Sequence, residues 1–181
     1  MRRQDINRRE FITGCVATAA AGSAVACSTE PVARPAGVPV GPFGSESTAE
    51  QVSEGLDLSG MTALVTGSNS GIGYETARVL ALRGARVICA ARNEEKAVTT
   101  SESIAGNTSP SVFDLAEWDT IVTATDMIKA ADEPIDMLIC NAGIMELPEL
   151  QQVNGIERQF AVNHLGHYIL VRRLLDQVKA A

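Results

Sequence analysis

Apolar and polar residues alternate in blocks over residues 61–181. Short apolar runs of four or five residues predict strands, and the longer stretches between them repeat apolar residues every three or four positions, as helices do. The expected strands are Thr62–Thr66, Arg86–Ala90, Ser111–Phe113 and Met137–Cys140. The expected helices are Ile72–Arg83, Glu94–Ile104, Glu117–Ala130 and Val153–Val178, preceded by a short helix over Thr48–Glu54 that a capping box of Ser47 and Glu50 would start.

This alternation predicts an α/β fold with a parallel sheet. Three of the four strand runs are apolar without a polar face, as expected for strands that helices cover on both sides. Strands alternating with helices build a Rossmann-type, doubly wound sheet, and right-handed crossovers give the strand order 3-2-1-4. We expect this sheet to stop after the fourth strand and the helix that follows it.

The first 27 residues have the pattern of a targeting segment. Asn7–Thr13 resembles the twin-arginine export motif, with Arg8 and Arg9 paired ahead of an apolar run that ends in Ala24-Val25-Ala26-Cys27. This predicts export to the periplasm or anchoring to a membrane. Cys27 resembles the acceptor cysteine of a lipoprotein, so simple cleavage and a lipid anchor are both open. The alternative is a basic N-terminal extension on a cytoplasmic protein.

Proline content and charge divide the rest of the chain. Residues 28–46 hold four of the seven prolines and are expected to be a linker, so that residues 47–181 form the N-terminal part of a folded domain. The net charge is −7, and residues 1–27 carry +2, so the remainder carries −9. An acidic body argues against a nucleic-acid partner, which requires a basic face.

A glycine-rich loop links the first strand to the first long helix. Glycines let the backbone approach a pyrophosphate, while the helix N-terminus offers free N–H groups and a positive dipole end. No Lys-Ser/Thr pair follows the glycines, so the loop is not a Walker A motif. The predicted phosphate-binding residues are Thr66, Gly67, Ser68, Asn69, Ser70, Gly71, Ile72 and Gly73.

The spacing T-G-x-x-x-G-x-G resembles that of the short-chain dehydrogenase/reductase family, in particular its retinol-dehydrogenase-like branch. Three further segments resemble family motifs at consistent spacing: Asp114-Leu115, Asn141-Ala142-Gly143 and Asn163–Tyr168. Cys140 replaces the first Asn of the family's N-N-A-G motif. The resemblance covers about residues 43–181 and implies hydride transfer between NAD(P) and a small carbonyl or alcohol substrate.

The resemblance also implies roles for these residues. Asp114 and Leu115 would meet the adenine ring, although Asp114 could instead cap the helix that starts near Glu117. Asn141, Ala142 and Gly143 would line the nicotinamide-ribose side. Asn163 would be the catalytic asparagine that holds a water in the proton relay.

The residues after the second strand bear on which dinucleotide binds. Ala91 stands where an acidic residue would grip the ribose 2′-hydroxyl of NAD, and Arg92 follows it. A guanidinium without a competing carboxylate suits a 2′-phosphate. We therefore expect NADP as the cofactor, with NAD and a solvated Arg92 as the alternative.

Cysteine and histidine spacing does not indicate a metal site. Cys89 and Cys140 fall on strands that flank the first strand, roughly 9–10 Å apart, so we expect two small buried hydrophobic residues and no disulfide. His164 and His167 have helical i,i+3 spacing, but no third ligand accompanies them, and Gly166 between them suggests close packing.

The family's catalytic Tyr-x-x-x-Lys pair has no match in this sequence. Tyr74 and Tyr168 are each followed four places on by an arginine, which is a poor substitute for lysine, and we expect both tyrosines to be helix packing positions. We expect this chain to be the N-terminal, cofactor-binding portion of a longer reductase and to be inactive alone. The alternative is a non-catalytic, exported dinucleotide-binding module.

Overall fold

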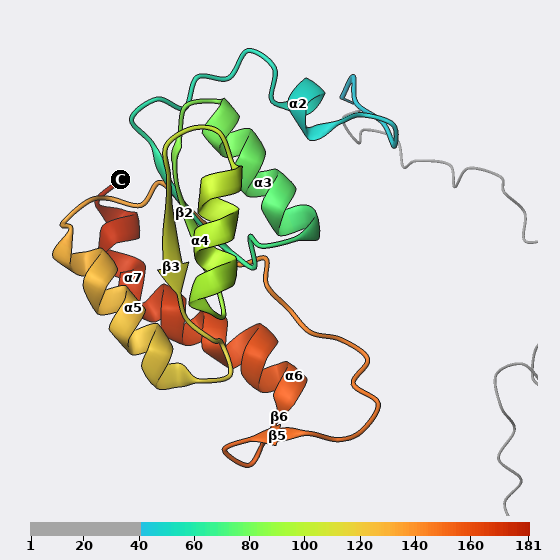
Figure 1. The fold of residues 1–181 in the computed structure, drawn as a ribbon, viewed down its shortest axis with the longest axis vertical. Coiled ribbons are helices and arrows are strands. Elements are labelled where there is room, and N and C mark those ends of the chain that lie inside the picture. The colour runs from blue at the N-terminus through green and yellow to red at the C-terminus, as the bar shows by residue number, and fades with distance from the viewer. Residues whose placement is uncertain (1–40) are drawn as a thin grey trace, which may run out of the picture. The chain divides into compact units, whose positions relative to one another are not determined.

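A computed structural model of the chain describes residues 41–181, of which residues 43–181 form one unit. The predicted export segment and nearly all of the predicted linker lie outside the described residues. The elements, in chain order, are α2 (Ala49–Val52), β1 (Thr62–Thr66), α3 (Gly71–Leu82), β2 (Arg86–Ala91), α4 (Glu94–Ser103), β3 (Thr108–Val112), α5 (Trp118–Ala130), β4 (Met137–Ile139), β5 (Gln152–Val153), β6 (Ile156–Glu157), α6 (Arg158–Phe160), the π-helix η1 (Ala161–Gly166) and α7 (His167–Lys179) (Figure 1).

Four strands, β1 to β4, form a parallel sheet in the order β3-β2-β1-β4, which confirms the predicted topology. β1 lies inside the sheet and all five of its residues are buried. Leu64 at its centre is paired with Ile88 of β2 and Leu138 of β4. The chain turns from one side of β1 to the other between β3 and β4, which makes the carboxyl edge beside β1 the topological switch point.

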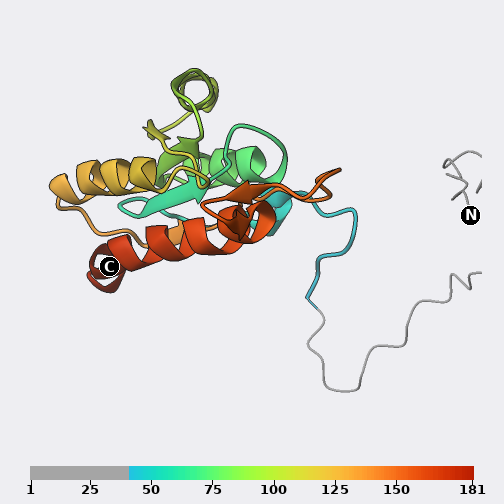
Figure 2. The same ribbon diagram turned by 90° about the horizontal axis from the view of Figure 1, so that it is seen from below.

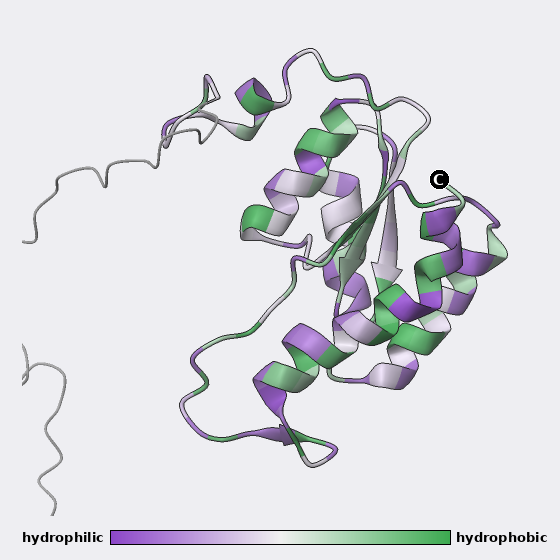
Figure 3. Ribbon diagram, turned by 180° about the vertical axis from the view of Figure 1, so that it is seen from behind, coloured by the Kyte–Doolittle hydropathy of each residue, from purple (hydrophilic) through white to green (hydrophobic). Residues whose placement is uncertain are grey.

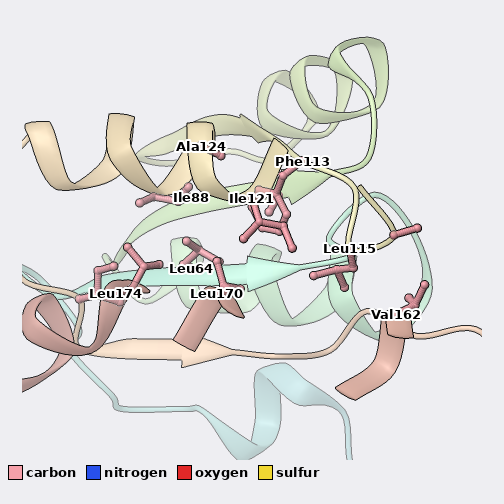
Figure 4. Close-up of a cluster of buried hydrophobic side chains, with 12 residues drawn as sticks. Leu64, Ile88, Phe113, Leu115, Ile121, Ala124, Val162, Leu170 and Leu174 are labelled. Atoms are coloured by element: carbon pink, nitrogen blue, oxygen red, sulfur yellow. The ribbon is translucent and has the colours of Figure 1, made fainter. Parts of the chain in front are cut away.

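Helices cover both faces of this sheet (Figure 2). Alternate residues of one strand face opposite sides, so Leu64 belongs to one core cluster while its neighbours Ala63 and Val65 belong to the other. The Leu64 cluster joins the sheet to α5 and α7 through large side chains, including Ile121 and Leu170 (Figure 4). The other cluster is rich in alanine, so the α3 backbone packs closely on β1 and β2.

The helices carry the polar surface (Figure 3). Green and purple segments alternate along α5 and α7, which matches their placement with one face on the sheet and the other in water. Within residues 41–181, none of the helices is long and apolar enough to cross a membrane.

The prediction of a helix over Val153–Val178 is wrong at its start. Asn154 and Gly155 both have positive φ, at 51° and 78°, and they turn the chain between β5 and β6. An Asn-Gly pair between short β-prone segments is a strong hairpin signal, because both residues tolerate this conformation. The helical run begins only at Arg158, where the Glu157 carboxylate accepts hydrogen bonds from the backbone N–H groups of Gln159 and Phe160.

Three smaller expectations also need correction. The first helix is only Ala49–Val52, and its capping box is formed by Thr48 and Gln51, one residue later than expected. Cys89 is buried as expected but Cys140 is exposed, because β4 is the outermost strand and ends at Ile139. Tyr168 is 58% exposed and is not a packing position.

Candidate functional site

An open cavity of about 560 Å³ lies at the carboxyl edge of the sheet, where the loops that follow all four parallel strands meet. Twelve of the predicted cofactor residues line it: Thr66, Gly67, Asn69, Ser70, Ile72, Gly73, Arg92, Asp114, Leu115, Asn141, Ala142 and Gly143. Ser68 and Gly71 of the predicted set do not. The cavity therefore occupies the crevice where open α/β sheets bind their ligands.

The loop between β1 and α3 is shaped by its glycines. Gly67 has φ +67° and Gly71 has φ +56°, a region that side chains other than glycine rarely adopt. A side chain at Gly73 would collide with the Gly67 carbonyl and the Asn141 amide, so helix and loop can pack this closely only through glycine. Ser68 is fully buried and its hydroxyl donates to the Ala90 carbonyl at 3.3 Å, which ties the loop to β2.

The N-terminus of α3 faces the cavity without a side-chain cap. Ser70 is the N-cap residue, but its hydroxyl makes no capping hydrogen bond. The first N–H groups of an α-helix have no partner within the helix, and the helix dipole gives that end a partial positive charge. The twelve-residue helix α3 thus presents donors and positive potential to the cavity, which suits a pyrophosphate.

Thr66 connects the two walls of the cavity. Its hydroxyl oxygen accepts hydrogen bonds from the backbone N–H groups of Asn141 at 2.9 Å and Ala142 at 3.0 Å. The Asn141 side chain returns a bond to the Thr66 carbonyl at 3.0 Å. The Thr66 hydroxyl therefore holds the segment after β4 in place.

His167 completes this arrangement from α7. Its Nδ1 lies 3.1 Å from the Asn163 carbonyl, which can only accept, so Nδ1 carries the proton. Nε2 is then the acceptor for the Thr66 hydroxyl at 3.0 Å. Burial lowers the pKa of His167, and this favours the neutral ring that the Nε2 contact with Thr66 requires.

Asn163 lies in η1 and binds the backbone of Ile144 with both ends of its amide. Oδ1 accepts from the Ile144 N–H at 2.9 Å, and Nδ2 donates to the Ile144 carbonyl at 2.8 Å. π-Helical turns of this kind are frequent at functional sites. The side chain of the predicted catalytic residue thus fixes the loop that follows β4, close to Gly143.

Charges around the cavity contrast with the acidic body. Arg92, Lys96 and Arg158 line it, against the single acid Asp114. Within residues 41–181, neither Arg92 nor Lys96 forms an ion pair or a side-chain hydrogen bond. The carboxylate of Asp114 accepts from the Ala116 N–H at 2.8 Å, and the N-cap of α5 is Glu117, so the alternative role of Asp114 as the cap of this helix is not found.

The cofactor-binding residues predicted from the sequence did not include Lys96 and Arg158, which also line the cavity. Lys96 could have been predicted from the sequence, because it lies one helical turn after Arg92. Asn93 caps α4 by accepting from the Lys96 N–H at 3.0 Å, so Lys96 lies in the first turn of this helix. Arg158 reaches the cavity only because the β5–β6 hairpin sets where the last helical run begins. That placement depended on the Asn-Gly turn that the helix prediction missed.

The family model for short-chain dehydrogenases matches residues 61–181, which include every loop around the cavity. The chain belongs to this family. Its members are oxidoreductases that bind NAD(P), and this chain carries their nucleotide-binding sheet and glycine-rich loop.

Curated relatives place the chain among longer short-chain dehydrogenases. It is 41% identical to short-chain dehydrogenase TIC 32 B, chloroplastic, from Brassica napus, over 77% of this chain and 45% of the relative. It is 41% identical to human retinol dehydrogenase 13, over 68% of this chain and 39% of that protein. The chain therefore spans less than half the length of these relatives.

Solved structures of other short-chain dehydrogenases share the fold. A gluconate 5-dehydrogenase from Burkholderia cenocepacia, in complex with NADP and tartrate, has a TM-score of 0.58 and 32% identity, covering 68% of this chain and 51% of that one. A metagenomic short-chain oxidoreductase in complex with NADP has a TM-score of 0.57 and 31% identity, covering 67% of this chain and 58% of that one.

Residues 41–181 contain no group of three or more His, Cys, Asp or Glu residues arranged to hold a metal ion. His164 stacks on Phe160, with ring centroids 5.1 Å apart, and His167 bonds to Thr66 and the Asn163 carbonyl. Both histidines therefore have partners within the fold.

Proposed function

We propose that this chain supplies the NADP-binding half of an oxidoreductase that transfers a hydride between NADP(H) and a small carbonyl or alcohol substrate. The family supports the reaction type, and the NADP-bound relatives of similar structure support the cofactor. The nicotinamide of the bound cofactor would supply the hydride chemistry. The residues of this chain would bind and orient that cofactor.

The observation that favours NADP is a pair of cations after β2 that have no ion-pair partner among the described residues. Arg92 and Lys96 line the cavity next to Ala91, where an acidic residue would otherwise bind a free 2′-hydroxyl. A 2′-phosphate carries up to two negative charges, and hydrogen bonds between ionised groups are about twice as strong as neutral ones. Two neighbouring cations to which no carboxylate of residues 41–181 is bonded fit that group.

The remaining predicted residues have compatible positions. The uncapped N-terminus of α3 would hold the pyrophosphate, and Asp114 and Leu115 line the wall assigned to adenine. The backbone of Asn141–Gly143, held by the Thr66 hydroxyl, would face the nicotinamide ribose. Asn163 would contribute to the proton relay from η1, where its amide already fixes Ile144.

The test measures the dissociation constants of NADPH and NADH by titration of the full chain. Arg92→Asp should weaken NADPH by at least about tenfold, or 1.4 kcal/mol, and change NADH far less. Lys96→Gln should act in the same direction. Arg172→Asp is the matched control, because Arg172 is exposed on α7 and does not line the cavity. Equal weakening of both cofactors by Arg92→Asp would refute the assignment of Arg92 to the 2′-phosphate.

We also propose that residues 1–27 direct export through the twin-arginine route. The paired Arg8 and Arg9 and the small residues before Cys27 support this. Replacing both arginines with lysine should retain the protein in the cytoplasm of the expressing bacterium. Cys27→Ala distinguishes the two fates of an exported chain, because only lipid attachment requires that thiol. Unchanged location after the arginine replacement would contradict the proposal.

A further inference from the structure

Arg158 lines the cavity, and its guanidinium forms no ion pair with the residues that the structure describes. Its Nη1 donates to Gln151 Oε1 at 2.7 Å, but its buried Nε has no hydrogen-bond partner within residues 41–181. The adjacent carboxylate of Glu157 is engaged by the backbone N–H groups of Gln159 and Phe160. None of the ion pairs in the described part of the chain involves Arg158.

The position of Arg158 is unfavourable for the fold itself. It is the first residue of the helical run from α6 to α7, where the positive end of the helix dipole disfavours a cation. A buried donor without a partner adds a further destabilising contribution. A guanidinium kept at such a cost in the lining of the cavity requires an explanation.

Packing of the helical run places Arg158 beyond the Asp114-Leu115 corner. Gly166 lies against Leu115 so closely that an added Cβ would be 2.6 Å from the Leu115 carbonyl oxygen. Val162, one turn earlier, belongs to the same core cluster as Leu115 (Figure 4). Arg158 lies one further turn towards the start of the run and lines the cavity together with Val162 and Leu115.

We propose that Arg158 is a specificity-determining residue that recognises the purine base of the bound dinucleotide; this inference rests on the proposed function. Leu115 and Val162 provide an apolar wall for the faces of the ring. Asp114 keeps one carboxylate oxygen free of hydrogen bonds to the described residues and can accept from an exocyclic amine. Arg158 supplies the complementary donor to a ring nitrogen at the edge of the base.

The surroundings of Arg158 differ from those of Arg92 and Lys96. Arg92 and Lys96 lie one helical turn apart after β2, and two neighbouring cations suit a phosphate. Arg158 lies on the later helical run and lines the cavity with the apolar side chains of Val162 and Leu115, which suit a planar base.

The test uses titration calorimetry of the full chain with NADPH. Arg158→Met should weaken NADPH about tenfold, and Arg158→Lys should weaken it by a smaller factor, because lysine lacks the planar fork. Arg172→Met, on the same helical run, should leave binding unchanged. Thermal melting of each variant shows whether it is folded. Arg158→Gln is a second variant without the guanidinium, for use if Arg158→Met does not fold.

Salt dependence distinguishes the base from a phosphate. Screening weakens contacts between charged groups, so Arg92→Met should flatten the dependence of the NADPH dissociation constant on ionic strength. Arg158→Met should keep the slope of the wild type. Flattening by Arg158→Met, or unchanged affinity in all Arg158 variants, would overturn the inference while leaving the proposed function intact. A wild-type chain that binds no dinucleotide would overturn both.

Discussion

The hydroxyl of Thr66 lies 3.0 Å from Nε2 of His167, although the two residues are 101 positions apart in the chain. Thr66 ends the central strand and His167 begins α7. The same hydroxyl accepts from two backbone N–H groups after β4, so one side chain joins β1, the β4 loop and α7 directly below the cavity.

Removing this hydroxyl should destabilise the fold. Thr66→Val keeps the shape but leaves two N–H groups and the His167 nitrogen without their partner, each worth about 1–3 kcal/mol when buried. We expect the free energy of unfolding to fall by about 2–4 kcal/mol in urea denaturation. Thr66→Ser retains the hydroxyl and should recover most of the loss. A Thr66→Val protein as stable as the wild type would show that water replaces the hydroxyl.

His167 should make stability depend on pH. Burial lowers its folded-state pKa, so the unfolded chain binds the proton more readily. Stability is therefore full above the unfolded pKa, about 6.5, and is lost as pH falls from there towards the folded pKa. Denaturation curves between pH 7.5 and 5.0 should show this decline, and His167→Gln should remove it. A decline of equal size in the variant would assign the effect to other groups.

Asn163 should control the order of the loop after β4. Asn163→Ala removes both hydrogen bonds to the Ile144 backbone, and each is worth about 0.5–1.5 kcal/mol. Hydrogen exchange of the Ile144 amide should accelerate by roughly tenfold or more in the variant. Amides of β2 serve as the internal reference, because they lie in the sheet and should keep their protection. Unchanged exchange at Ile144 would show that the loop is held by other contacts.

Gly166 should tolerate no side chain. Gly166→Ala would place a Cβ 2.6 Å from the Leu115 carbonyl oxygen and 2.9 Å from its Cβ, and such overpacking costs typically about 1–3 kcal/mol. The helix propensity of alanine offsets up to about 1 kcal/mol of this. Gly44→Ala is the control, because nothing lies within 4 Å of the added atom. A Gly166→Ala chain that melts at or above the wild-type temperature would contradict this packing.

The sheet could be predicted because its signals are local. The apolar run of β1, the glycines after it and the repeated strand–helix pattern each report on neighbouring residues, and the handedness of crossovers then leaves few topologies. The loop residues from Gly67 to Gly73 could be placed for the same reason. The cofactor-side positions of Asp114 and Asn141 came from the resemblance to known dehydrogenases.

What the sequence alone did not show depends on contacts between distant segments. The bond from His167 to Thr66 has no local signature, and neither does the exposure of Tyr168 on α7. Arg158 needed both the Asn-Gly hairpin and the packing of the following helix before its place at the cavity could be known. The hairpin had a readable signal that the helical periodicity of the downstream residues outweighed.

β4 is the outermost strand of the described sheet and pairs only with β1. Its residues Met137, Leu138 and Ile139 are half-buried, while those of β1 are buried throughout. An apolar strand with one free row of backbone donors and acceptors is a template on which a strand of another molecule can add. Concentration-dependent self-association through this edge is therefore the behaviour to control first when the chain is purified.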